Sequence, residues 1–285
     1  MTKRIESINR LDLNNIVQGD RIMNIQQYYR MAANTWLNGS LAALIFVSVV
    51  MIPSFVFSAS KEVTFFAFPF ILYGLFSYQR YRLNIQHAVD SSKTLPEKQE
   101  VVSLFENEQT LLEFMPAPSL RMLIFSPTGI LCGEIRDLHY KAFRWFIPNF
   151  IDRIFSSEYG LFDGENQLAA TFSWKGRKTV EIRDFETGQL FTVRQERNRN
   201  LRRWTASFKE ESIFVQSAVL FTDIQFMNED RLVVSRVRKG WMPLEWTRYF
   251  MNANTPVLSF DRQLLREDKL FVLAVIIHLF RYYEH

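Results

Sequence analysis

Basic side chains gather in the stretch Lys175–Arg203, and the chemistry open to them is the binding of anions. The stretch holds nine Lys or Arg residues against four acidic residues, a local excess of about five. Near the cytoplasmic leaflet, each well-placed cation contributes about 1 kcal/mol to the binding of anionic lipid. Asn198 and Asn200 are typical of an exposed loop, so we place the contact first on the neighbouring arginines, namely Arg194, Arg197, Arg199, Arg202 and Arg203. The alternative is a set of solvated turns and exposed strand faces.

The sequence shows no pattern typical of an enzyme or a metal site, so we predict a non-enzymatic protein with no catalytic residue, no metal and no cofactor. It contains no glycine-rich phosphate loop, no His-Glu-x-x-His and no Gly-x-Ser-x-Gly. His278 lies in an apolar segment, where we expect a hydrogen-bonded core histidine rather than a ligand. The single cysteine, Cys132, excludes an intramolecular disulfide and a cysteine-built zinc site, and we expect it to be buried.

Short strands are expected to position the basic stretch. Apolar Val180 and Ile182 alternate with polar Glu181 and Arg183, which is the period of a strand with one wet face. Turn signals flank this strand on both sides. The pattern predicts a β-meander over residues 159–197. Further runs of the same kind predict an antiparallel barrel or sandwich, and they lie at 204–208, 212–220, 223–227 and 231–237.

The segment Leu270–Phe280 is apolar on every side except at His278. As a helix that rises about 1.5 Å per residue, it is only about half as long as a bilayer core is thick. A helix that is hydrophobic all round must be surrounded by protein. We therefore predict a mainly β fold, an antiparallel closed β-barrel around this apolar C-terminal helix.

Two uncharged runs, 31–60 and 63–78, predict a membrane anchor near the N-terminus. A span needs about 20 mostly apolar residues, and the shorter second run is extended by arginine side chains that snorkel to the interface. The few residues between the runs leave no room for a domain, so we predict a two-helix transmembrane hairpin. Basic residues flank it on both outer sides, which puts both termini of a two-pass chain in the cytoplasm. The alternative is a pair of buried helices in a soluble core.

The composition leaves room for both an anchor and a packed domain. Of the 285 residues, 48% are hydrophobic and 15% aromatic. The net charge of +4 is too small to indicate a nucleic-acid partner, and we expect none. We predict a cytoplasmic N-terminal segment at 1–30, the transmembrane hairpin at 31–80, a stem and linker at 81–109, and the barrel domain at 110–285.

The residues 110–285 resemble the tubby-like superfamily. The resemblance lies in the meander, with the turn at 163–166, Trp174 and the turn at 184–188, followed by the apolar helix. It implies a twelve-stranded barrel around a central helix that binds membrane lipids or a membrane-proximal partner. In tubby proteins a basic surface binds phosphoinositides, and the corresponding candidates here are Lys175, Arg177, Lys178, Arg194, Arg197, Arg199, Arg202 and Arg203.

Our first hypothesis is a membrane-anchored module whose cytoplasmic barrel binds anionic phospholipid headgroups or a protein partner at the bilayer. One alternative is a phospholipid scramblase or lipid transporter, which has to act as an oligomer because two short helices cannot enclose a path for lipids. The chain departs from the scramblases of the superfamily, because its membrane segments precede the barrel and it lacks a cysteine cluster and a calcium loop. Another alternative is a protein-interaction scaffold, sensor or immunity factor.

Overall fold

The computed structural model describes residues 23–56, 61–92, 103–117, 119–139, 158–176, 178–197, 202–206, 212–217 and 222–283. Two long helices come first, α2 (Ile25–Val56) and α3 (Lys61–Ser92). Twelve strands follow, and helix α5 (Arg266–Tyr283) comes after the last strand. The strands are β1 (Gln109–Phe114), β2 (Arg121–Phe125), β3 (Leu131–Asp137), β4 (Glu158–Asp163), β5 (Leu168–Lys175), β6 (Thr179–Asp184), β7 (Leu190–Arg197), β8 (Arg202–Ala206), β9 (Ser212–Ser217), β10 (Asp223–Met227), β11 (Val233–Arg238) and β12 (Val257–Phe260), with the 3-10 helix η3 (Leu244–Arg248) between β11 and β12.

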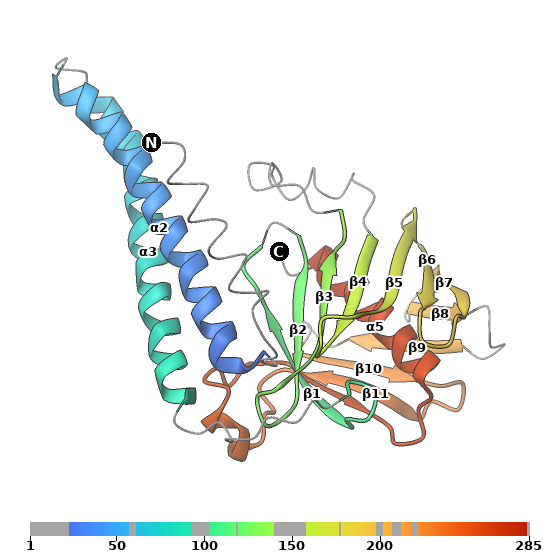
Figure 1. Ribbon diagram of the computed structural model, residues 1–285. Coiled ribbons are helices and arrows are strands. Elements are labelled where there is room, and N and C mark those ends of the chain that lie inside the picture. Colours follow the sequence, from blue (N-terminus) through green and yellow to red (C-terminus); the bar gives the residue numbers. More distant parts are fainter. Residues whose placement is uncertain are drawn as a thin grey trace.

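The strands form one closed barrel in which each strand pairs with its neighbours in sequence and β12 returns to β1 (Figure 1). Every pairing is antiparallel, as the period-2 patterns predicted. In the meander, Trp174 pairs with Val180 and Ile182 pairs with Phe191. Gly176 has a φ of 76°, a left-handed conformation that the tight β5–β6 turn requires. The prediction of a closed antiparallel barrel is confirmed.

Helix α5 fills the barrel (Figure 1). Every residue from Leu270 to Phe280 is buried, and these residues share one hydrophobic core with the inward-facing side chains of the strands. His278 is among them, and its ring lies edge-on to that of Trp204, with 5.0 Å between the centroids. Among the described residues, no group of three His, Cys, Asp or Glu side chains is arranged to hold a metal ion. The prediction of an apolar C-terminal helix is confirmed.

An ion pair fixes the first turn of α5 to the barrel wall. The Arg266 guanidinium donates through Nε and Nη2 to the two carboxylate oxygens of Asp184, at 2.7 and 3.1 Å. Asp184 is fully buried and also accepts hydrogen bonds from the Glu186 backbone N–H and the Thr187 hydroxyl. Arg266 stacks over the Phe105 ring at 3.9 Å. The pKa of Asp184 lies below its ordinary value of 3.8, because these hydrogen bonds outweigh the opposing effect of its burial.

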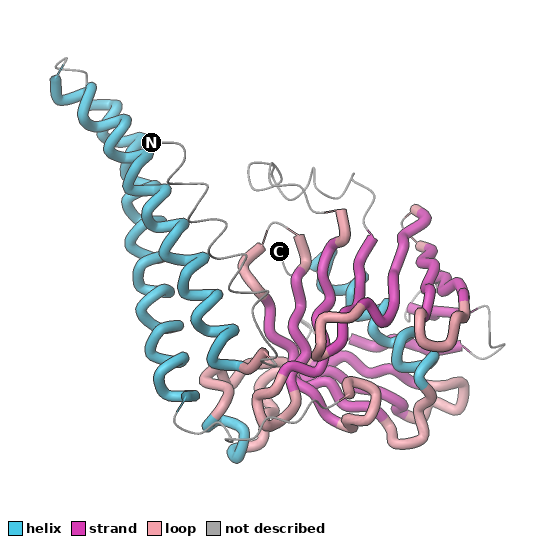
Figure 2. The backbone as a smooth tube through the Cα atoms, in the orientation of Figure 1, coloured by secondary structure: helices cyan, strands magenta, loops and turns pink. Residues whose placement is uncertain are grey.

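Helices α2 and α3 form an antiparallel hairpin that projects from the barrel (Figure 2). Side-chain pairs recur along its length, with Tyr29 against His87, Trp36 against Phe76 and Phe46 against Phe70. Small residues sit at the crossing, where Gly74 lies against Ala43 and accepts a 3.0 Å hydrogen bond from the Ser40 hydroxyl.

The predicted pair of membrane spans is only partly supported. In the part of the chain that the structure describes, one helix is long and apolar enough to cross a membrane, over residues Ile25–Ile52 of α2. The uncharged stretch of α3 between Glu62 and Arg80 is shorter and contains Pro69, Tyr73 and Tyr78. Length and composition alone therefore do not identify α3 as a second span, and the two-pass topology stays a prediction.

Candidate functional site

The outer half of the hairpin carries large apolar side chains that no part of the described protein covers. Ile45 is 65% exposed and Phe65 is 79% exposed. The exposed apolar residues of this half are Leu41, Leu44, Ile45, Phe46, Val49 and Ile52 on α2, and Phe65, Phe68, Phe70, Ile71, Leu72, Leu75 and Phe76 on α3. Soluble monomers rarely expose contiguous apolar patches larger than a few hundred Å². An exposed apolar surface of this extent is typical of a contact with a protein partner or a membrane.

Aromatic and basic side chains gather near the middle of the hairpin, below this apolar surface. Arg80 lies over the Phe76 ring at 5.2 Å, and the Trp36 ring meets the same ring edge-on. Tyr78 packs against Tyr81, with 5.9 Å between the ring centroids. Trp, Tyr and Arg are the side chains that prefer the boundary between lipid and water. The contacts of Trp36, Phe76 and Arg80 join the two helices at this point of the hairpin.

The start of α2 is attached to the β2–β3 turn of the barrel. Backbone hydrogen bonds join Ile25 N–H to the Gly129 carbonyl at 2.8 Å and Leu131 N–H to the Met23 carbonyl at 2.9 Å. A Cβ atom at Gly129 would lie 2.9 Å from Ile25 Cγ2, so this close approach needs glycine. Asn24 and Gln27 exchange side-chain and backbone hydrogen bonds in the manner of a capping box. The hairpin therefore begins at a defined point on the barrel.

A second hydrophobic core lies between the hairpin and the outer wall of the barrel. From α2 it contains Ile25, Tyr28, Tyr29 and Ala32, and from α3 Ala88. From the barrel it contains Leu111, Met115, Leu123, Phe125 and Leu131, together with Tyr249 and Phe250 of the β11–β12 connection. This core joins the hairpin to the barrel over several turns of α2.

One ionisable group is enclosed at this junction. Glu113 on β1 is 8% exposed, and its two carboxylate oxygens accept hydrogen bonds from the Tyr28 hydroxyl at 3.1 Å and the Thr255 hydroxyl at 2.9 Å. Burial raises the pKa of Glu113 from 4.5 to about 7, and the two hydroxyl hydrogen bonds only partly oppose this rise. The Tyr29 hydroxyl accepts a hydrogen bond from the backbone N–H of Met251. Three separate segments thus meet around one carboxyl group.

The sequence-predicted basic residues come from two neighbouring turns at one end of the barrel. Lys175 and Lys178 flank the β5–β6 turn, and Lys178 accepts a backbone hydrogen bond from Gln195 of β7. Arg194 lies opposite Thr179 in the next pair of strands. The side chains of Lys175, Lys178 and Arg194 are all exposed. The register therefore brings these three residues to the same end of the sheet.

The arginines of β7 and β8 extend this group, and acidic residues partly offset it. Arg197 pairs with Arg202 at the end of the β7–β8 hairpin, and Arg203 lies opposite Glu196. Lys175 forms an ion pair with Glu181 on the neighbouring strand. Arg177 and Arg199 lie outside the described residues, as do the side chains of Arg197, Arg202 and Arg203. The backbone thus gathers the described members of the set, and Lys175 among them is already engaged by Glu181.

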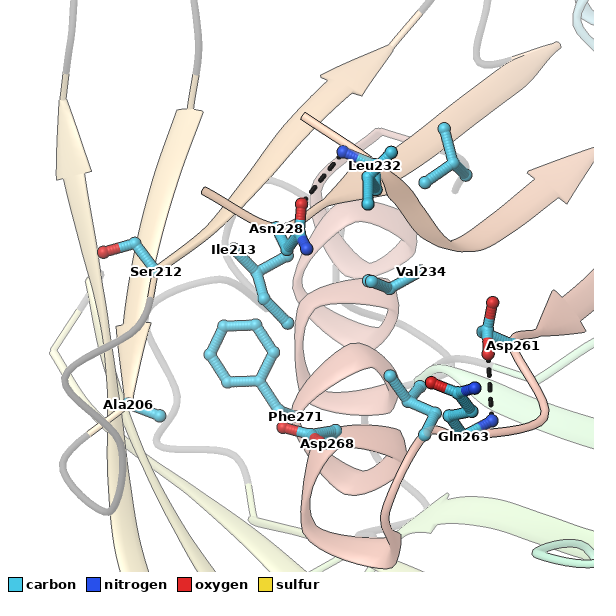
Figure 3. A pocket seen from close by; sticks show the side chains of 12 residues that line it. Ala206, Ser212, Ile213, Asn228, Leu232, Val234, Asp261, Gln263, Asp268 and Phe271 are labelled. Atoms are coloured by element: carbon cyan, nitrogen blue, oxygen red, sulfur yellow. Dashed lines mark hydrogen bonds between the residues drawn. The ribbon is translucent and has the colours of Figure 1, made fainter. Parts of the chain in front are cut away.

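A pocket of about 270 Å³ opens at the other end of the barrel, beside the first turns of α5 (Figure 3). Ile213, Val234 and Phe271 form an apolar wall, and Asn228 and Asp261 lie at its polar side. The full lining is Ala206, Ser212, Ile213, Asn228, Leu232, Val233, Val234, Asp261, Gln263, Leu264, Asp268 and Phe271. The sequence did not predict this pocket, because its walls come from five separate segments.

Comparison of the sequence with known proteins identified no relative. No protein-family model matches the sequence, and no curated protein matches it. The resemblance to the tubby-like superfamily therefore stays a prediction.

Proposed function

We propose that this protein is a two-pass, membrane-anchored, non-enzymatic module that holds a tubby-like barrel against the cytoplasmic leaflet, where the barrel binds anionic lipid. The observation that carries the proposal is the exposed apolar surface on the outer half of the α2–α3 hairpin. Because α2 and α3 pack on each other from Tyr29 to Phe46 and from Phe70 to His87, α3 enters the bilayer with α2. Arg80 and Arg82 then lie at the lipid boundary, where long basic side chains are stable.

The orientation of the barrel supports a contact with lipid. In Figure 1 the C-terminal end of α5 and the tip of the hairpin point toward the same side, and the β5–β6 turn lies at that end of the barrel. The hairpin cannot swing freely, since the second hydrophobic core and the backbone hydrogen bonds of Ile25 and Leu131 hold its base. In the proposed topology, the end of the barrel that carries Lys175, Lys178 and Arg194 is the end nearer the bilayer.

The architecture supports the proposed family. A twelve-stranded closed barrel filled by an apolar helix that follows the last strand is what the resemblance to the tubby-like superfamily implied. The superfamily includes lipid-binding members, so the proposed membership and the proposed lipid contact agree with each other.

The anchoring is tested by cell fractionation and by labelling of the hairpin tip. We expect the full chain to stay in the membrane pellet after alkaline carbonate extraction. We also expect Lys61→Cys to react with a membrane-impermeant maleimide only from the non-cytoplasmic side. The native Cys132 is buried and gives little background. Recovery of the chain in the aqueous fraction without detergent would contradict the anchor, and labelling of position 61 from the cytoplasmic side would contradict the two-pass topology.

The lipid contact is tested by hydrogen exchange of the full chain in nanodiscs. We expect the β5–β6 turn and the β7–β8 hairpin to exchange more slowly when phosphatidylserine is added to phosphatidylcholine, and to lose this protection at high salt. The triple variant Arg199→Ala, Arg202→Ala, Arg203→Ala should remove most of it. A matched control is Arg231→Ala, which lies in the β10–β11 turn at the other end of the barrel. Equal protection in both variants would remove the basic surface from the proposal.

A further inference from the structure

The carboxyl group of Glu113 lies where the hairpin meets the barrel. It belongs to β1, yet it points outward into the second hydrophobic core, between Leu111 and Met115 of the same face. Its hydrogen-bond partners come from two other segments, Tyr28 on α2 and Thr255 on the β11–β12 connection. A carboxyl group in this position links α2 to β1 and to the β11–β12 connection, which are three of the parts that meet at the base of the hairpin.

Glu113 has hydroxyl partners but no cation among the described groups that face it. From α2 it meets Tyr28 and, behind it, Tyr29. From α3, His87 stacks edge-on against Tyr29. From β2, Leu123 lies directly opposite Glu113, and Arg121 two residues away is engaged by Glu134 at 2.7 Å. The charge of an ionised Glu113 would therefore have to be accommodated in apolar surroundings.

We propose that Glu113 is a proton-operated latch, which holds the hairpin tightly against the barrel when it is protonated and loosens the junction when it ionises. A neutral carboxyl group satisfies its hydrogen bonds to Tyr28 and Thr255 at little desolvation cost. An ionised carboxylate is more stable in water, which it reaches only if the base of α2 moves away from β1. The latch acts on the contact between hairpin and barrel, and it does not depend on whether the basic end binds lipid.

The direction of the pH dependence follows from linkage. The pKa of Glu113 is about 7 in the docked state and 4.5 as the ordinary value. Protonation therefore favours the docked state, and its equilibrium constant falls up to about tenfold for each pH unit between these two values. Below this pH window docking is tightest. Above the window the docking constant has reached its lowest value and no longer changes with pH. A cytoplasmic pH near neutrality lies at the upper edge of the window, where small changes in pH alter the fraction of ionised Glu113.

The test measures the distance between hairpin and barrel in the full chain in detergent micelles. Spin labels are attached at Asn34→Cys on α2 and Asp230→Cys in the β10–β11 turn, which are both exposed. From about pH 4 to about pH 8 we expect one narrow distance to give way to a broader population, with a midpoint inside the window between the two pKa values of Glu113. Glu113→Gln keeps a neutral hydrogen-bonding side chain, so it should show the narrow distance at every pH.

Two further variants make the result specific. Thr255→Val removes a hydrogen bond that Glu113 makes only in the docked state, so docking weakens and the midpoint should move to lower pH. Glu165→Gln, an exposed carboxyl in the β4–β5 turn, should leave the midpoint unchanged. A distance that does not change with pH in the unmodified chain would overturn the proposal. So would a pH response that survives in Glu113→Gln, or a Glu113→Gln hairpin that is detached at every pH.

Discussion

Replacement of Arg266 by Met tests how the central helix is held in the barrel. Met keeps most of the apolar volume that packs on Phe105 but removes both hydrogen bonds to Asp184. Asp184 is fully buried and would remain as an unpaired carboxylate. Removing one partner of a buried ion pair costs about 3–5 kcal/mol of the free energy of unfolding. We expect about 3 kcal/mol, the low end of the range, because Glu186 and Thr187 still donate hydrogen bonds to Asp184.

The assay is urea unfolding of the full chain in micelles, followed by the fluorescence of the buried Trp174 and Trp204. Arg262→Met is the matched control, because its ion pair with Glu108 is at the surface, with 81% and 52% of the two side chains exposed. It should change the free energy of unfolding by about 0.5 kcal/mol or less. The double variant Asp184→Asn, Arg266→Met should lose less than Arg266→Met alone, since the charge that was left unpaired is gone.

The pH dependence gives the same test an independent readout. The pKa of Asp184 is lowered in the folded chain, so the stability that its ionised form contributes is present above its ordinary value of 3.8 and is lost as the pH falls through the lower folded value. In Arg266→Met the folded pKa should rise, and acid unfolding should move to higher pH. The two variants are expected to differ. If Arg266→Met and Arg262→Met lose the same free energy of unfolding and show the same acid transition, the ion pair with Asp184 does not hold α5 in place.

Three further predictions concern the hairpin and the core. Gly74→Leu should push α2 and α3 apart, because a Cβ at this position already lies 3.5 Å from that of Ala43; cysteine cross-linking across the hairpin should fall, whereas Leu75→Ala on the exposed face should leave it unchanged. Leu273→Ala should cost about 2–5 kcal/mol of unfolding free energy in urea, since Leu273 is fully buried in the barrel; a cost near zero would place α5 elsewhere. Burial raises the pKa of the Cys132 thiol to about 12, so a maleimide should label it in urea but not in the native chain at neutral pH, and rapid native labelling would contradict its position.

The sequence was sufficient for the elements whose pattern is local. Alternation around Val180 and Ile182 identified the meander, and the unbroken apolar run at Leu270 identified a helix that needs a protein environment. Boundaries were less certain, since the strand predicted at 204–208 is observed at Arg202–Ala206. The inward-facing side chain that its register requires is Trp204, which lies in the middle of the strand rather than at its start.

The features that depend on contacts between distant segments were beyond the sequence. Glu113 lies in the run Leu111–Met115, where a single acidic residue is compatible with an ordinary solvent-facing position. Only the packing of Tyr28 over β1 makes it a buried carboxyl. Of the basic residues, Lys175, Arg194, Arg197, Arg202 and Arg203 belong to strands β5, β7 and β8, and the ion pair of Lys175 with Glu181 depends on the β5–β6 register. A lone charge within an apolar strand is the signal in the sequence that points to Glu113.

Because α5 follows the twelve strands in the sequence, the barrel cannot be completed until late in synthesis. During translation all twelve strands leave the ribosome before α5 does, and the hairpin before them. Until α5 is synthesised, it cannot cover the inner faces of the strands. The barrel also stays open until β12 is available to pair with β1. A chain interrupted ahead of Arg266 would therefore expose the apolar inner faces of its strands, which is a state that chaperones and proteases recognise.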